Sequence, residues 1–86
     1  MISLQLADLH ERQAAYHRSM ARDHTSLGHE GAALRHTLAA QAHEAAGAAP
    51  LDKADAEAAM RASTIADQAS QRASVRPLIP SLARSP

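Results

Sequence analysis

The chain has 86 residues, and its nine basic residues balance nine acidic ones to a formal net charge of zero. Because neither half carries a basic stripe, we expect neither nucleic-acid binding nor a polybasic membrane anchor. The absence of cysteine excludes a disulfide scaffold, a thiol nucleophile and thiolate metal sites. Alanine is abundant and large apolar residues are few, so helices should form readily around a thin core. Self-association or a protein partner would then be needed for stability.

Histidine recurs every seventh residue through the first half of the chain. A small residue follows four positions after most of these histidines, as Ala14 follows His10 and Ala40 follows His36. This is an internal repeat at helical period. The six histidines are His10, His17, His24, His29, His36 and His43, with a single step of five in the middle.

An apolar stripe accompanies the histidines. Placed at 100° per residue, its members fall within a sector of about 80°. The stripe keeps its phase through Leu27, which favours one long helix over residues 3–47, bent or broken near Gly28. The weak helix formers around Gly28 and Gly31 mark the alternative, a full break that would give a three-helix bundle. The stripe consists of Ile2, Leu6, Leu9, Tyr16, Met20, Leu27, Leu34 and Leu38.

We interpret this stripe as the core seam of an all-α protein, with Tyr16 and Met20 as its anchor. Gly47 and Pro50 end the first segment, and Asp52 supplies an N-cap for a second helix over about residues 53–75. That helix should pack on the first as a hairpin within a single domain of residues 1–76. Its small buried face is predicted to comprise Ala54, Ala58, Ala62, Ile65, Ala69 and Ala73, beside Ala59, Ala66 and Ser70.

Residues 77–86 contain three prolines and are predicted to form an extended arm. Leu78, Ile79 and Leu82 give this arm an apolar side. We expect these side chains to be buried against a neighbouring subunit or partner chain, since fixed proline angles lower the entropy lost on binding. The alternative is an arm that folds back over its own helices.

The histidines are the residues most suggestive of chemistry. Seven residues separate neighbouring rings by about 10.5 Å along one helix, so no two of them can chelate one ion within that helix. Across a hairpin turning near Ser26 and Leu27, or across two antiparallel copies, the repeat instead pairs them in layers. Such layers could hold Zn²⁺, Cu²⁺ or Ni²⁺ if a second pair or a carboxylate completed the site. The predicted pairs are His24 with His29, His17 with His36, and His10 with His43.

Our preferred interpretation makes the histidines amphipathic fillers that flank the apolar seam, so we assign no metal, cofactor or catalytic residue. No combination of nucleophile, base and orienting group is apparent, and we do not expect an enzyme. The first six residues do not resemble a signal peptide, and no run approaches 18 apolar residues. We therefore expect a cytoplasmic or virion location.

The segment from Ala14 to Ala46 contains AAYHRSMARDH, LGHEGAALRH and AAQAHEAA. It resembles small Ala/His-heptad helical proteins encoded among phage and prophage genes, for which no activity is assigned. The resemblance implies a non-enzymatic structural or assembly protein, such as a virion component, that forms homo-oligomers or docks on a protein partner. The alternatives are a histidine-layer metal-binding protein and a small inhibitor or adaptor. The expected interface residues are Leu9, Tyr16, Met20, Leu27, Leu34, Leu38, Leu78, Ile79 and Leu82.

Overall fold

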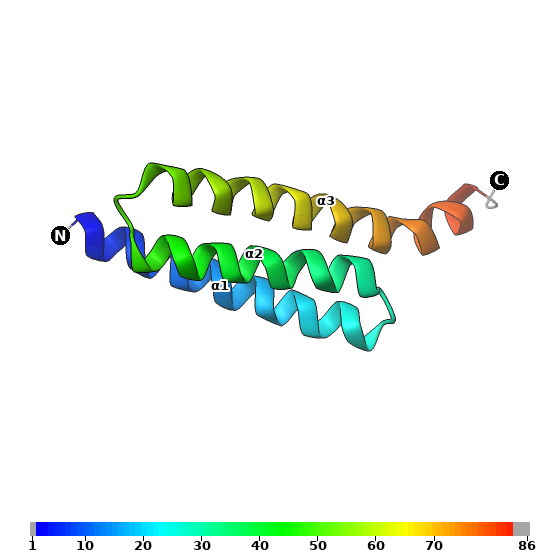
Figure 1. Cartoon of the computed structure of the whole chain (residues 1–86). Helices are drawn as coiled ribbons and strands as arrows, with labels where there is room; N and C mark the ends of the chain where they lie inside the picture. Colours follow the sequence, from blue (N-terminus) through cyan, green and yellow to red (C-terminus); the bar gives the residue numbers. More distant parts are fainter. Residues whose placement is uncertain (1, 84–86) are drawn as a thin grey trace.

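The computed structural model describes the backbone of residues 2–83 and the side chains of residues 4–73. It comprises three helices, α1 (Ile2–Ser26), α2 (Glu30–Ala48) and α3 (Lys53–Ala83). Consecutive helices run antiparallel, and α2 packs against both α1 and α3 (Figure 1). The fold is therefore all-α, as expected, with three helices in place of a single long helix and a second one.

The break between α1 and α2 overturns the preferred single helix over residues 3–47 and agrees with the alternative, a break near Gly28 that gives three helices. Gly28 adopts a positive φ of 78°. Its N–H donates to the Thr25 carbonyl at 3.0 Å, and the His29 N–H donates to the His24 carbonyl at 2.7 Å. This pair of bonds is a Schellman closure, for which glycine is the favoured residue because it has no Cβ to clash. His29 caps α2 without a side-chain bond, so packing between the helices has to offset a weak N-terminus.

Histidines and alanines alternate along the contact between α1 and α2, which we call the His/Ala seam. The close approach shows at Gly47, where an added Cβ would lie 3.4 Å from the Cβ of His10. Small side chains on both helices make this approach sterically possible. The buried residues of the seam are His10, Ala14, His17, Ala21 and His24 on α1, and Ala32, Ala33, His36, Ala39, Ala40, His43 and Ala46 on α2.

The apolar stripe is not the core, and that interpretation is wrong. Within residues 4–73, every buried apolar side chain is an alanine. Leu9 and Tyr16 are about half exposed, at 50% and 46%, and Met20 is half-buried. Leu27, Leu34 and Leu38 are exposed as well. The physical reason is steric, because the adjacent His/Ala face lets two helices come closer than a face of leucines would.

Helix α3 begins at Lys53 as predicted, and the Asp55 N–H donates to the Asp52 carboxylate at 3.1 Å. Its buried residues are Ala59, Ala66 and Ser70, all from the small set expected at this face. The predicted face is nevertheless rotated, because Ala54 and Ile65 are exposed.

Helix α3 continues to Ala83, beyond the predicted end near residue 75. The expected extended conformation is thus not met between residues 77 and 83. A proline inside a helix costs about 3 kcal/mol relative to alanine but does not exclude helical geometry. The predicted docking of Leu78, Ile79 and Leu82 lies outside the residues whose side chains the structure describes.

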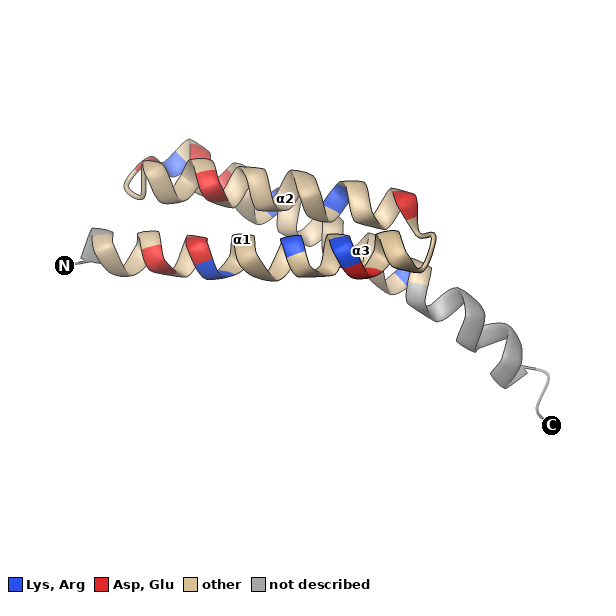
Figure 2. Ribbon diagram, turned by 90° about the horizontal axis from the view of Figure 1, so that it is seen from below, with Lys and Arg blue, Asp and Glu red and all other residues tan. Residues whose placement is uncertain are grey.

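Charged residues of both signs are spread over all three helices (Figure 2). On the surface between α1 and α2, Arg18 donates two hydrogen bonds to Glu44, at 3.0 and 2.6 Å. For the described residues, no helix combines the length and apolar character needed to cross a bilayer.

Candidate metal centre

The predicted histidine pairs form across the seam between α1 and α2. The Nδ1 atoms of the two rings are 2.9 Å apart in the His10–His43 pair. They are 2.8 Å apart in the His17–His36 pair, and 3.0 Å apart in the His24–His29 pair. The register predicted for a hairpin is confirmed. The rings lie inside the seam, however, so the interpretation of the histidines as fillers that flank an apolar core is wrong.

The pairs also stack on one another. The rings of His17 and His43 are 5.7 Å apart between centroids with an interplanar angle of 14°. Those of His24 and His36 are 5.5 Å apart at 12°. With the paired rings at 5.0 to 5.2 Å, all six histidines form one continuous column, which we call the histidine column. Its order is His10, His43, His17, His36, His24 and His29.

Two serines of α3 hold the outer nitrogens of the column. Ser63 Oγ lies 2.9 Å from His17 Nε2 and 2.5 Å from His43 Nε2. Ser70 Oγ lies 2.7 Å from His24 Nε2. A hydroxyl can accept a hydrogen bond from one ring while donating to another, so Ser63 can satisfy both of its neighbours. In each Nδ1–Nδ1 contact, one neutral ring donates and the other accepts.

One fully buried nitrogen of the column has no partner. His36 is fully buried, and its Nε2 has no hydrogen-bond partner among the described residues. Whichever tautomer His36 adopts, this leaves either an unpaired N–H or an unpaired lone pair. An unsatisfied buried polar group costs about 1–3 kcal/mol, and such groups are rare enough to require an explanation.

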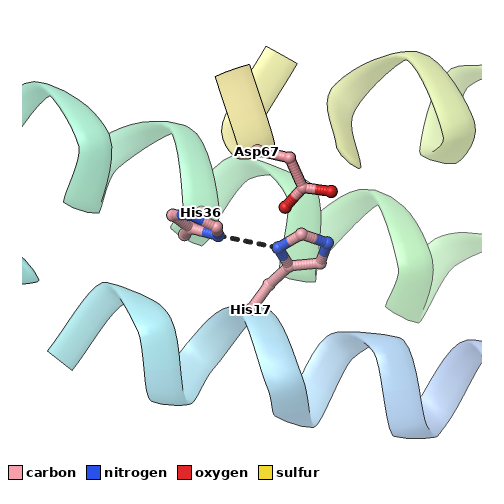
Figure 3. Close-up of side chains that lie close together, drawn as sticks. All are labelled: His17, His36 and Asp67. Atoms are coloured by element: carbon pink, nitrogen blue, oxygen red, sulfur yellow. Dashed lines mark hydrogen bonds between the residues drawn. The ribbon is translucent and has the colours of Figure 1, made fainter. Parts of the chain in front are cut away.

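A carboxylate lies beside the central pair of imidazoles. Asp67 of α3 joins His17 and His36 in a cluster whose potential ligand atoms, one from each residue, all lie within 4.8 Å of one another. Figure 3 shows the Asp67 carboxylate directed toward the two rings. The cluster draws one residue from each helix, with two buried imidazoles and an exposed carboxylate at its outer side.

Burial favours the neutral form of the central imidazoles. Desolvation lowers the pKa of His17 below its usual 6.5, and the nearby His36 and His43 lower it further, against an opposing effect of Asp67. Desolvation and the neighbouring His24 likewise lower the pKa of His36, again opposed by Asp67. The pKa of His43 falls through desolvation and its contact with His10. A neutral imidazole retains the lone pair that a metal ion needs.

The donor set fits a first-row divalent ion. Zinc bound at about 2.0–2.1 Å by two nitrogens in a tetrahedral arrangement holds them roughly 3.3 Å apart. The His17 and His36 Nδ1 atoms are 2.8 Å apart, so binding through them would require the rings to separate by about half an ångström. Two histidines and one carboxylate leave a fourth position for water, as in zinc sites with three protein ligands. Among the described residues, neither of the other pairs belongs to a comparable cluster.

Sequence reasoning anticipated the paired histidines and the need for a carboxylate, but missed Asp67 and Ser63. A signal was present, since Ser63 and Ser70 share the seven-residue spacing of the histidines and Asp67 lies one turn from each. Of the interface residues expected from the sequence, Tyr16 contacts the column, with its ring edge-on to His17 at 4.9 Å. The exposed Leu9, Leu27, Leu34 and Leu38 are not part of the cluster.

Comparison of the chain with protein-family models, with curated proteins and with solved structures finds no match.

Proposed function

We propose that this is a non-enzymatic helical protein that binds one divalent ion of the Zn²⁺, Cu²⁺ or Ni²⁺ class through His17, His36 and Asp67. The observation that carries the proposal is that two buried imidazoles and one carboxylate, one from each helix, each place a potential ligand atom within 4.8 Å of the others. A bound cation would supply the positive charge that the cluster of His17, His36 and Asp67 lacks when its imidazoles are neutral. Imidazole nitrogen is a good ligand for all three metals, and the chain offers no thiolate to favour a softer ion.

Ser63 supports the proposed site by orienting His17. When the His17 Nε2–H donates to Ser63, the proton is absent from Nδ1, and the Nδ1 lone pair faces His36. Histidine ligands usually donate their second nitrogen in this way, which fixes both the tautomer and the ring orientation. Ser63 is therefore a positioning residue in our proposal.

Metal binding would also stabilise the fold. The three ligands come from three helices, so one ion would tie α3 to the α1–α2 hairpin. A ligand that binds only the folded state raises stability with its free concentration, by about 2.7 kcal/mol at one hundred times its Kd. This gives the proposal a readout that does not depend on any spectroscopic property of the metal.

The test is a titration of the chelator-treated chain with Zn²⁺, Cu²⁺ and Ni²⁺, followed by calorimetry and by thermal unfolding. We expect one ion per chain at the central cluster and a higher melting temperature in its presence. The variants His36→Gln and Asp67→Asn should abolish or strongly weaken binding. Glu57→Gln, which removes another exposed carboxylate of α3, is the matched control and should bind normally.

The serines of α3 provide a finer comparison. Ser63→Ala should weaken metal binding about 10- to 100-fold, as the loss of a group that orients a ligand commonly does. Ser70→Ala removes the equivalent hydroxyl from His24 and should leave the affinity nearly unchanged. No binding to the parent chain, or binding that survives Asp67→Asn and His36→Gln together, would refute the proposed site.

A structural or assembly role is the second candidate, and it includes the virion component that the resemblance implies. The observation in its favour is that the large apolar side chains are exposed, as they would be on a subunit awaiting a neighbour. Measuring the mass of the purified chain in solution tests whether it assembles with itself. An adaptor role through residues 77–86 concerns side chains outside those described.

A further inference from the structure

A polar pocket lies beside the turn at Gly28, where the start of α2 faces α3. It has a volume of about 480 Å³, and we call it the arginine pocket. Arg35 of α2 and Arg72 of α3 line it, and none of its lining residues is an aspartate or glutamate. Since acidic and basic residues balance over the whole chain, the pocket is a local excess of positive charge. Its other lining residues are Gly28, His29, Gly31, Ala32, Ala69 and Ala73.

The two arginines of the pocket are available to a ligand. Both are exposed, and neither forms an ion pair with a residue whose side chain is described. A hollow lined by Arg18 and Arg22 provides the contrast, because Glu44 already binds the Arg18 guanidinium there. Guanidinium groups bind the oxygens of carboxylates and phosphates through paired N–H donors. The arginine pocket therefore has the side chains of an anion site without an internal anion.

Two backbone donors of the pocket are unpaired as well. Gly31 and Ala32 belong to the first turn of α2, and their N–H groups have no partner among the described residues. His29 precedes this turn and makes no side-chain bond to it, while the acidic Glu30 does not line the pocket. Ala32 is only 5% exposed, so water has little access to it. An anion in the pocket could accept these hydrogen bonds, and the helix dipole would act in the same direction as the arginines.

The pocket has room for more than an inorganic anion. A phosphate of five heavy atoms occupies roughly 150 Å³, at about 30 Å³ an atom, the share of one water molecule in the liquid. The 480 Å³ of the pocket lies within the usual range of small-molecule sites, about 300–1,000 Å³. Ala32, Ala69 and Ala73 give it an apolar side. An added Cβ at Gly28 or Gly31 would meet nothing within 4 Å, so the space beside both glycines is open.

We propose that the arginine pocket binds the phosphate monoester of a small organic molecule, with Arg35 and Arg72 holding the phosphate and the alanines contacting the organic group. A phosphate monoester carries a charge of about −1.5 to −2 at pH 7 and three strong acceptor oxygens. It therefore matches two guanidinium groups and two N–H donors better than a carboxylate, which has a single charge and two oxygens. The pocket contains none of the proposed metal ligands, so either site can fail without the other.

The test is calorimetric titration of the metal-free chain, after removal of the chelator, with phenyl phosphate, inorganic phosphate and benzoate. An ionic strength of about 0.15 M screens the charges outside the pocket. We expect one phenyl phosphate per chain, bound more tightly than either of the other two probes. Arg35→Gln and Arg72→Gln should each weaken binding about tenfold or more, because each removes a charged hydrogen-bond donor. Arg12→Gln, which removes the same charge from an exposed site outside the pocket, is the matched control and should bind normally.

A second variant fills the pocket without changing its charge. Gly31→Leu places a side chain in the open space beside Gly31, and leucine favours a helix more than glycine does. Circular dichroism should show the helices intact, while phenyl phosphate binding is lost. The proposal is overturned if the parent chain does not bind phenyl phosphate, or if binding survives Arg35→Gln and Arg72→Gln together. It is equally overturned if Arg12→Gln weakens binding as much as the pocket variants do, or if inorganic phosphate or benzoate binds as tightly as phenyl phosphate.

Discussion

Two rows of side chains on helix α1, one residue apart in the sequence, differ in burial. The stripe through His10 and His17 is buried against α2, while the stripe through Leu9 and Tyr16 stays about half exposed. Both follow a seven-residue repeat, and hydrophobicity alone would bury the leucines. The difference teaches that the steric fit of the seam, with an alanine between successive histidines, decides which face two helices share.

The exposed stripe contributes little of the stability that its leucines would provide if they were buried. Fully burying a leucine side chain contributes about 1.5–3 kcal/mol, and none of the leucines in residues 4–73 is buried. The His/Ala seam obtains its stability from many close contacts between small groups and from hydrogen bonds that are paired within the seam. Its rings have to satisfy one another, because water has little access to them.

Truncating one residue of the His/Ala seam and one residue of the apolar stripe should give the largest difference in stability. His36→Ala should destabilise the chain by about 2–4 kcal/mol, through a cavity and the loss of the bond to His17. Leu34→Ala, on the exposed side of the same helix, should change stability by no more than about 0.5 kcal/mol. Urea unfolding with chelator present measures both. Equal losses would mean that the leucines contribute to the core after all.

The buried histidines should also make stability depend on pH. The pKa values of His17, His36 and His43 are lowered in the folded chain. The unfolded chain therefore takes up protons first as pH falls below about 6.5, and the folded state loses stability through that range until its own histidines titrate. The full contribution is present above the unfolded value. The exposed stripe has no histidine and adds nothing to this effect.

The urea concentration at the midpoint of unfolding of the metal-free protein should thus decrease as the pH is lowered from 7.5 to 5. His43→Gln should flatten the profile, because it removes one of the three groups with a lowered pKa. A midpoint that does not change with pH, with helicity intact, would contradict the burial of neutral imidazoles.

Substitutions at the turn between α1 and α2 should give the smallest changes in stability. Gly28→Ala should cost about 1–2 kcal/mol, because Gly28 has a left-handed φ that alanine adopts only under strain. Gly31→Ala, inside α2 with open space around the added Cβ, should instead stabilise by up to about 1 kcal/mol. Thermal unfolding distinguishes the two signs. A stabilising Gly28→Ala would show that the closure of α1 is not needed for the hairpin.

The pairing of the histidines could be predicted because it follows from arithmetic. Once the chain turns near Leu27, a repeat of seven on both sides brings His17 opposite His36 and fixes the other pairs. What remained open was whether the chain turns there at all. The phase of the apolar stripe continues through Leu27, and this continuity favours a single helix, although it only reflects the repeat that both helices share.

The seven-residue repeat could not predict which residues form the core, nor that Asp67 would be the third ligand. Pattern reasoning ranks leucine above alanine and histidine for burial, and it contains no measure of how closely two helices approach. Asp67 belongs to a helix whose rotation about its own axis was misjudged, as the exposed Ile65 shows. A helix rich in alanine has several faces of nearly equal hydrophobicity, so its orientation depends on contacts such as those of Ser63 with the column.

The turn at Gly28 has a consequence for how this chain tolerates changes in length. The histidine column begins at the turn and grows away from it by one pair per seven residues on each helix, or about 10.5 Å. Inserting seven residues before His10, seven after His43 and seven at the start of α3 in the same pattern would append another histidine pair and keep the contacts of Ser63 and Ser70 with the existing pairs. An insertion of three or four residues in one helix alone would instead set imidazoles opposite methyl groups. Length variants of this chain should therefore stay folded only as matched, seven-residue changes in all three helices.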